Sequence, residues 1–235
     1  MPLVAGLVIA AAVVTQAATG SGFGVVASPL LVLLDHHFVP GPLLCVTMIV
    51  MLGIVRRERR ALALTRLSWA LVAAVPAAVG GLLLVPKLTG RATSFLIGLF
   101  VVVSVAASML GWQVRAGRAQ LAVAGGMAGF LGSVAAVPGP PLVVAYADAD
   151  AHRYRANLSA FFALTAGISV LGMAARGDLD TGDLALTVVL LPGVVVGLVA
   201  AHMAVPRLPE RALRPLALTL SLCAGLVLLI RTVVA

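Results

Sequence analysis

Two short stretches of this sequence combine hydroxyl side chains with glycines and prolines in otherwise apolar surroundings. The first reads GSGFG at residues 20–24, and the second reads SVAAVPGPP at residues 133–141. Glycine permits backbone turns that other residues resist, and proline removes a backbone donor, so each stretch is expected to interrupt a helix. The N-terminus of the short helix that follows would carry free N–H groups and a partial positive charge, which attract an anion.

The candidate binding residues lie at these interruptions or in the spans that follow them. Hydroxyl and amide donors suit an oxyanion, and they cost less to bury in a membrane than charged groups. The predicted substrate-binding set is Gln16, Gly20, Ser21, Gly22, Gly24, Ser28, Pro29, Thr47, Ser133, Pro138, Gly139, Pro140, Pro141, Asn157 and Ser159. Two plainer readings stand beside this one. Small residues also permit tight helix packing, and Ser or Thr hydroxyls also bond to their own helix backbone.

Other chemistry has few candidates in this chain. No Asp or Glu falls in the middle of an apolar segment, and the HExxH, GxSxG and Walker lysine motifs are missing. We therefore predict a non-enzyme without a cofactor or metal centre. Asp35, His36 and His37 follow the first short helix, and Asp148 and Asp150 follow the second. They could border an entrance, although a solvated loop is the simpler explanation.

Composition places the protein in a membrane. Of its 235 residues 62% are hydrophobic and only 10% are charged, and the mean hydropathy is +1.15. A water-soluble exterior cannot be built from so few polar residues, so lipid must be the outer solvent. The net charge of +8 comes from residues between apolar segments, which indicates orientation signals and no nucleic-acid partner. The first residues lack the basic lead of a secretory signal and are expected to begin the first helix.

The sequence also repeats itself. Gly20-Ser21 recurs as Gly132-Ser133, and Pro76 recurs as Pro192. The block VPKLTGR at residues 85–91 returns as VPRLPER at residues 205–211. The offset grows from 112 through 116 to 120 positions, which predicts two insertions of one helical turn each. We expect an all-α integral membrane protein with one transmembrane domain, residues 1–235. Repeat one covers about residues 1–115 and repeat two about residues 116–235, as in many secondary transporters.

The charges between segments predict how the repeats are oriented. Residues 56–60 form the densest basic cluster and are expected in the cytoplasm, whereas the equivalent residues 176–183 are net acidic and are expected outside. Each repeat would then hold a broken, re-entrant helix pair and three full spans, and the repeats would be inverted. Lys87 and Arg91 on the outer side fit this arrangement poorly. The alternative is a parallel repeat with four complete crossings in each half.

The paired pattern resembles the TauE/SafE sulfite exporter family. The residues that carry the resemblance are GSGFG at 20–24 through Ser28-Pro29-Leu30-Leu31, Gly129-Phe130-Leu131-Gly132 through Pro140-Pro141-Leu142, and the two blocks at 85–91 and 205–211. The resemblance covers nearly the whole chain. It implies a multi-pass permease of the bacterial inner membrane for small sulfur-containing or organic anions. The second interruption departs from the family pattern because it holds fewer glycines.

The resulting prediction is a secondary transporter that exports sulfite, a sulfonate or a related organic acid by alternating access. Its expected partners are the small anion and the lipid bilayer. A passive anion channel could use the same helix ends, and a non-transporting membrane scaffold is the second rival. The coupling ion, the direction of transport and homo-oligomerisation are not written in the sequence.

Overall fold

The chain is all-helical. The computed structural model describes residues 2–109, 117–137, 142, 151–204 and 210–234, and these residues contain no β-strand. The helices of the first half are α1 (Pro2–Thr19), α2 (Phe23–Leu34), α3 (Gly41–Glu58), α4 (Leu64–Leu84) and α5 (Gly90–Met109). Those of the second half are α6 (Arg118–Ala135), α8 (Ala151–Arg176), α9 (Thr181–Ala204) and α10 (Glu210–Val234). Short 3₁₀ turns η1 (His36–Phe38), η2 (Arg59–Ala61) and η3 (Val85–Lys87) join helices in the first half.

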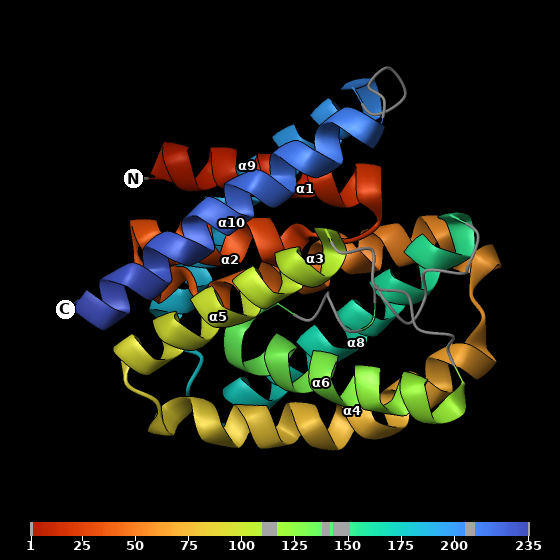
Figure 1. Cartoon of the computed structure of the whole chain (residues 1–235), viewed down its shortest axis with the longest axis horizontal. Helices are drawn as coiled ribbons and strands as arrows, with labels where there is room; N and C mark the ends of the chain where they lie inside the picture. Colours follow the sequence, from red (N-terminus) through yellow and green to blue (C-terminus); the bar gives the residue numbers. More distant parts are fainter. Residues whose placement is uncertain (1, 110–116, 138–141, 143–150, 205–209, 235) are drawn as a thin grey trace.

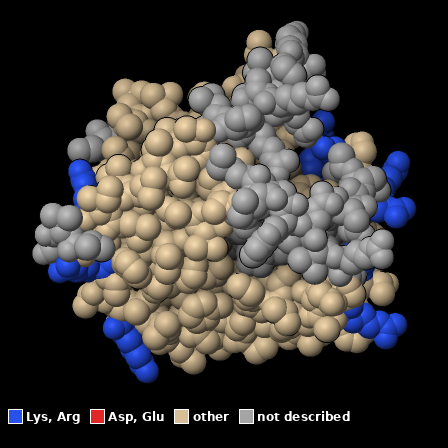
Figure 2. All heavy atoms as spheres, viewed as in Figure 1, with Lys and Arg blue, Asp and Glu red and all other residues tan. Residues whose placement is uncertain are grey.

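Several of these helices are built to cross a membrane. Four described segments are long and apolar enough, namely Pro2–Thr19, Leu64–Leu84, His152–Arg176 and Thr181–Met203. Large hydrophobic side chains on the outer faces of α4 and α9 are more than half exposed, among them Val72, Leu83 and Val195. In Figure 2, surface without Lys, Arg, Asp or Glu side chains lies between the Lys and Arg side chains at the left and right edges. The prediction of an all-α membrane protein is therefore confirmed.

The halves are held together by close contacts between small residues. In the pair α1 and α9, Gly6 lies against Gly193, and Ala10 lies against Gly197. The residue numbers rise together, so the two helices run in parallel. Small residues let helix backbones approach closely, and dispersion contacts then replace the hydrophobic driving force that lipid does not provide.

The pair α4 and α6 repeats this arrangement with the halves exchanged. Gly125 lies against the backbone of Ala70, and Gly129 lies against that of Ala74, again in parallel. In both pairs the first helix of one half, α1 or α6, packs against a later helix of the other half, α9 or α4 (Figure 1). The buried core is one cluster that draws residues from both halves.

Two further contacts between the halves are antiparallel. The end of α3 meets the start of α8, where Glu58 Oε2 lies 2.9 Å from His152 Nδ1. The start of α5 meets the end of α10, where Arg91 Nε donates to Thr232 O over 2.8 Å. Helices that hold the same place in the two halves thus pack on each other in opposite directions.

Two further pairs of helices from different halves, α3 with α9 and α4 with α8, run in parallel. α3 and α9 begin side by side, with Asp183 over Gly41, whereas α4 and α8 end side by side, where Arg176 Nη1 donates to Leu82 O over 2.8 Å. Because α3 and α8 are antiparallel, α4 and α9 also run in opposite directions. α1 is parallel to α9 and α6 to α4, so the same holds for α1 and α6.

The two ends of this bundle carry different charged residues. One end, where α3 finishes and α4, α6 and α8 begin, is rich in arginine and carries Arg56, Arg57, Glu58, Arg59, Arg60, Arg66, Arg118, Arg153 and Arg155. The opposite end, where α3 and α9 begin and α8 finishes, carries both signs of charge, namely Asp35, Lys87, Arg91, Arg176, Asp178, Asp180, Asp183 and Arg231. α1 begins and α10 ends at this opposite end (Figure 1).

The predicted break at residues 133–141 begins three residues later than expected. α6 continues through Ser133 to Ala135, and the left-handed residue is Ala136, with φ 54°. Gly20 holds the matching place after α1, with φ 71°. Both α1 and α6 have 18 residues, and their starts are 116 positions apart, like Pro76 and Pro192. The predicted one-turn insertion between these features is therefore absent.

The first testable prediction concerns the small-residue contacts. A Cβ on Gly125 would overlap with the carbonyl oxygen of Ala70, whereas a Cβ on Gly80 meets nothing within 4 Å. Gly125→Ala should force α4 and α6 apart and cost about 1–3 kcal/mol of stability. Thermal unfolding in detergent, followed by tryptophan fluorescence, should show a lower midpoint.

Gly80→Ala is the matched control and should leave the midpoint unchanged or raise it slightly, because alanine is the better helix former. Equal midpoints for the two variants would contradict the close packing of α4 on α6.

Candidate functional site

The interruption between α1 and α2 is a tight turn of three residues. Gly20 and Gly22 adopt φ values of 71° and 115°, in the left-handed region that side chains disfavour. Ser21 stands between them and is half-buried, as are Gly22 and Gly24. The two glycines explain why the chain can end one helix at Thr19 and begin another at Phe23.

Gln16 closes this turn from inside. Its side chain is buried, its Nε2 donates to Gly20 O over 3.0 Å, and its Oε1 accepts from Phe23 N over 3.2 Å. One amide therefore supplies a donor to the last turn of α1 and an acceptor to the first turn of α2. Without it, both groups would be buried and unpaired, which is costly. Gln16 was predicted as a ligand-binding residue, but these two side-chain hydrogen bonds go to backbone groups of the turn.

Thr19 is not in the predicted substrate-binding set, although it directly precedes Gly20. Its hydroxyl lies within hydrogen-bond reach of Thr15 O and Ser21 O, and Ser21 N–H lies 3.4 Å from its oxygen. A threonine in the last turn of a helix often bonds to the backbone four residues earlier, and this tendency could have predicted the role of Thr19.

The end of α6 packs directly against the start of α2. Ser28 Oγ donates to Ala135 O over 2.7 Å, and a Cβ on Gly24 would overlap with the carbonyl oxygen of Ala136. Pro29 is buried in the next turn of α2. The beginning of the second interruption therefore touches the first one. The predicted residues Pro138, Gly139, Pro140 and Pro141 lie outside the described residues.

The start of α8 covers the first interruption from the arginine-rich end. Tyr154 donates its hydroxyl to Ser21 Oγ over 3.1 Å. A Cβ on Gly20 would lie 2.7 Å from Arg155 Cγ and 2.9 Å from the Tyr154 ring, so both side chains rest on this glycine. Neither residue was predicted, because nothing in the sequence brings α8 to the end of α1.

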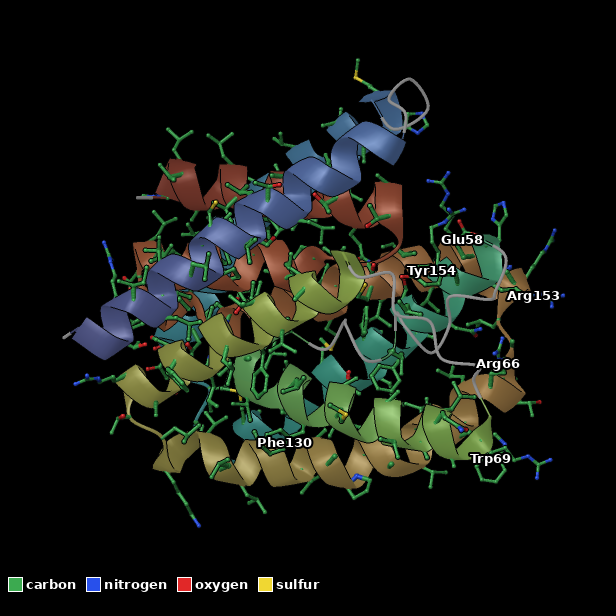
Figure 3. The ribbon with its side chains drawn as sticks, in the orientation of Figure 1. Glu58, Arg66, Trp69, Phe130, Arg153 and Tyr154 are labelled. Atoms are coloured by element: carbon green, nitrogen blue, oxygen red, sulfur yellow. The ribbon has the colours of Figure 1, made fainter. Side chains whose placement is uncertain are left out.

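An ion pair between the halves lies beside this cover. Glu58 of α3 has its Oε1 3.6 Å from Arg155 Nε and its Oε2 2.9 Å from His152 Nδ1. The Glu58 side chain is only 15% exposed and that of Arg155 is 24% exposed. Figure 3 shows Glu58 and Tyr154 near the end of α1. The carboxylate thus holds the guanidinium beside the interruption.

Three of the other predicted hydroxyl and amide groups bond to the protein itself. Thr47 Oγ1 donates to Leu43 O over 2.7 Å within α3. Asn157 Oδ1 accepts from Ala63 N over 3.0 Å, just before α4 begins. Ser133 Oγ lies 2.9 Å from Ser169 Oγ. These groups stabilise helix packing, as the plainer reading of them expected.

Ser159 differs from them. Its side chain is fully buried, and its Oγ has no hydrogen-bond partner among the described residues. A buried hydroxyl without a partner costs free energy, so it retains the capacity to bind a polar group.

The interruption offers chemistry that suits an anion. A helix start leaves the N–H groups of Gly24 and Val25 without acceptors inside α2, and the helix dipole adds partial positive charge there. The Ser21 hydroxyl lies at the same turn, and Arg155 passes over Gly20 with its Cγ while its guanidinium lies beside Glu58. The first-turn amide of Phe23 is already bonded to Gln16. The sequence predicted that two helix N-termini converge here. Only the N-terminus of α2 is described, because residues 138–141 lie outside the described residues.

Comparison with known proteins identifies the family of this chain. A family model described as Sulfite exporter TauE/SafE matches residues 4–228 of the 235 residues. No curated protein and no solved structure matches the chain. Since the match spans nearly the whole chain, including both interruptions and the covering residues of α8, the protein belongs to the TauE/SafE family of sulfite exporters.

Proposed function

We propose that this protein is a secondary transporter that exports a small anion, such as sulfite, a sulfonate or a related organic acid. The observation that carries the proposal is the contact between the two interruptions, where Gly24 meets Ala136 and Ser28 donates to Ala135. Two breaks that meet inside a helical membrane protein mark the binding sites of secondary transporters. Members of this family are transporters rather than enzymes.

The anion would bind at the start of α2. Its oxygens would accept hydrogen bonds from the Gly24 amide and the Ser21 hydroxyl, and its charge would interact with Arg155. Sulfite and sulfonates offer several acceptor oxygens in a compact group, which matches a site of converging donors. Pro138, Gly139, Pro140 and Pro141 would contribute from the second interruption, and Ser159 would supply a further hydroxyl.

The two halves would form an inverted repeat in a bacterial inner membrane. The opposite courses of α3 and α8, α4 and α9, and α5 and α10 support inversion. The concentration of arginines around residues 56–60 supports an orientation with residues 56–60 in the cytoplasm and residues 176–183 outside. The interruption between α1 and α2 would then open toward the cytoplasm.

Alternating access would require the cover of α8 to leave the interruption at one stage of the cycle. The Tyr154–Ser21 hydrogen bond and the Glu58–Arg155 ion pair would break together, because neighbouring residues of α8 make both contacts. A bound anion would favour this step by competing with Glu58 for Arg155.

The second prediction tests transport itself. Purified protein in proteoliposomes should exchange sulfite with saturable kinetics, and sulfonates or short carboxylates should compete. Ser21→Ala removes a hydroxyl donor and should lower flux about tenfold, since a lost partner for a charged ligand costs about 1.5–3 kcal/mol. Ser68→Ala, which alters an exposed hydroxyl bonded to Thr65 O in α4, is the matched control and should transport normally.

Single-channel currents through the reconstituted protein would show a passive anion channel instead. Intact cellular function with Ser21→Leu, in protein that still reaches the membrane, would favour the scaffold reading.

The third prediction tests the ion pair between the halves. Glu58→Arg should repel Arg155 and expose the interruption at the arginine-rich end. A partly buried pair of this kind is worth about 1 kcal/mol, so labelling of a Ser21→Cys variant from that side should accelerate about fivefold. The double exchange Glu58→Arg with Arg155→Glu should restore the slow rate. Labelling that stays fast in the double exchange would mean that the pair does not hold the cover.

A further inference from the structure

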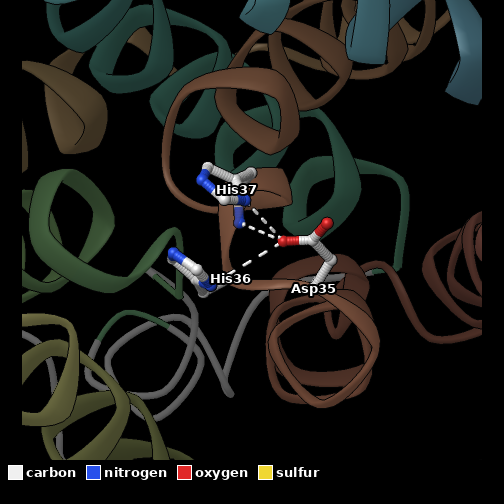
Figure 4. A group of neighbouring side chains, drawn as sticks. All are labelled: Asp35, His36 and His37. Atoms are coloured by element: carbon white, nitrogen blue, oxygen red, sulfur yellow. Dashed lines mark hydrogen bonds and ion pairs between the residues drawn. The ribbon is translucent and has the colours of Figure 1, made fainter.

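A compact group of metal-ligating side chains lies in the connection between α2 and α3, away from the interruptions. Asp35 ends α2, and His36 and His37 open the 3₁₀ turn η1 (Figure 4). The donor atoms of the three side chains lie within 4.8 Å of one another, and all three residues are exposed. No other group of this kind occurs among the described parts of the chain.

Both imidazoles direct Nδ1 toward the same carboxylate oxygen. His37 Nδ1 lies 2.7 Å from Asp35 Oδ1, and His36 Nδ1 lies 3.7 Å from it. The two rings lie side by side, with centroids 4.0 Å apart and an angle of 35° between their planes. A solvated loop requires neither feature, since two exposed histidines are free to turn away from each other into water.

Hydrogen bonds and buried neighbouring residues fix the turn that carries these side chains. The Asp35 carboxylate accepts from His37 N over 3.0 Å, and Phe38 N and Val39 N donate to Asp35 O and His36 O. Phe38 and Val39 are buried and anchor the turn in the apolar core. The backbone N–H of His37 and then its ring hold the pKa of Asp35 below its usual range, so the carboxylate stays charged. Little rearrangement is needed to present the three donors.

The spacing fits a tetrahedral metal ion. Zn²⁺ binds imidazole nitrogen and carboxylate oxygen at about 2.0–2.2 Å, which places neighbouring ligand atoms about 3.3 Å apart. The two distances to Asp35 Oδ1 lie on either side of this value. Small rotations of the two exposed rings would equalise them.

We propose that Asp35, His36 and His37 form a binding site for a divalent transition-metal ion of the Zn²⁺ type, completed by water. Imidazole and carboxylate are ligands that such ions prefer, and the exposure of all three side chains leaves a position open to solvent. Asp183 of α9 lies over Gly41 and is close enough to His37 to interact electrostatically, so it adds negative charge from the second half. The proposal goes beyond the transport function and does not depend on it.

The fourth prediction measures metal binding directly. Full-length protein carrying a tag without histidines should bind about one Zn²⁺ per chain in calorimetry, and Zn²⁺ should raise its unfolding temperature because the ion binds the folded state. Co²⁺ should give the d–d absorption of a tetrahedral site, which Zn²⁺ abolishes. Removal of a group that only hydrogen-bonds to a metal ligand weakens metal affinity about 10–100-fold. His37→Ala removes a ligand itself and should weaken Zn²⁺ binding more than that.

His202→Ala is the matched control, because His202 is exposed on α9 and belongs to no such cluster, and it should bind like the unaltered chain. Asp35→Asn keeps an oxygen to accept from His37 N, so the turn should persist while binding falls. Unfolding midpoints without metal should be similar in all variants. Absence of saturable Zn²⁺ binding in the unaltered chain, or equal binding in His36→Ala, His37→Ala or Asp35→Asn, would overturn the assignment.

Discussion

A helix that is interrupted inside lipid must find a partner for every backbone group that the interruption exposes. The turn between α1 and α2 meets this constraint with one buried amide, because Gln16 donates to Gly20 O and accepts from Phe23 N. The turn after α6 meets it partly with Ser28, which donates to Ala135 O. Gln16 and Ser28 thereby hold the start of α2 in place. This position sets the direction of the first-turn N–H groups of Gly24 and Val25, which have no acceptor within α2. Binding of an anion would supply the acceptors that the protein itself withholds.

The same constraint explains why the two interruptions touch. A carbonyl at the end of α6 and an amide at the start of α2 are both short of helical partners, and each is stabilised by the opposite dipole of the other helix. The absence of a side chain at Gly24 lets the two backbones approach that closely. A solute that binds there therefore acts on both halves at once, and this is the requirement for any carrier whose two ends open in turn.

Much of the fold follows from the sequence, because apolar length and helix breakers are local signals. The helices, the interruption at Gly20 and the dense basic cluster at residues 56–60 were all foreseeable. Ser133 was misplaced because Gly129 and Gly132 look like helix breakers, whereas inside α6 Gly129 provides the close approach to Ala74. The true turn falls at Ala136, a residue type that rarely adopts a left-handed conformation and therefore gives no warning. Tyr154 and Arg155 could not be found because their role comes from the packing of α8 on the turn after α1, a contact between residues more than 130 positions apart.

The packing between halves decides which parts can move. Gly6 and Ala10 of α1 are locked against Gly193 and Gly197 of α9, and α4 is locked against α6 in the same way. Close-packed backbones do not slide without losing many dispersion contacts, so each of these pairs should move as one body. The bodies thus mix helices of both halves, with α1 and α9 in one and α4 and α6 in the other. Since α3 begins beside α9 and α8 ends beside α4, the antiparallel contact of α3 with α8 forms the boundary between the bodies. Glu58 and Arg155 cross that boundary at one end, where α8 also covers Ser21. In the proposed transport cycle, a motion that separates the bodies at this end would uncover the interruption, so opening of the proposed site and loss of the ion pair would be one event.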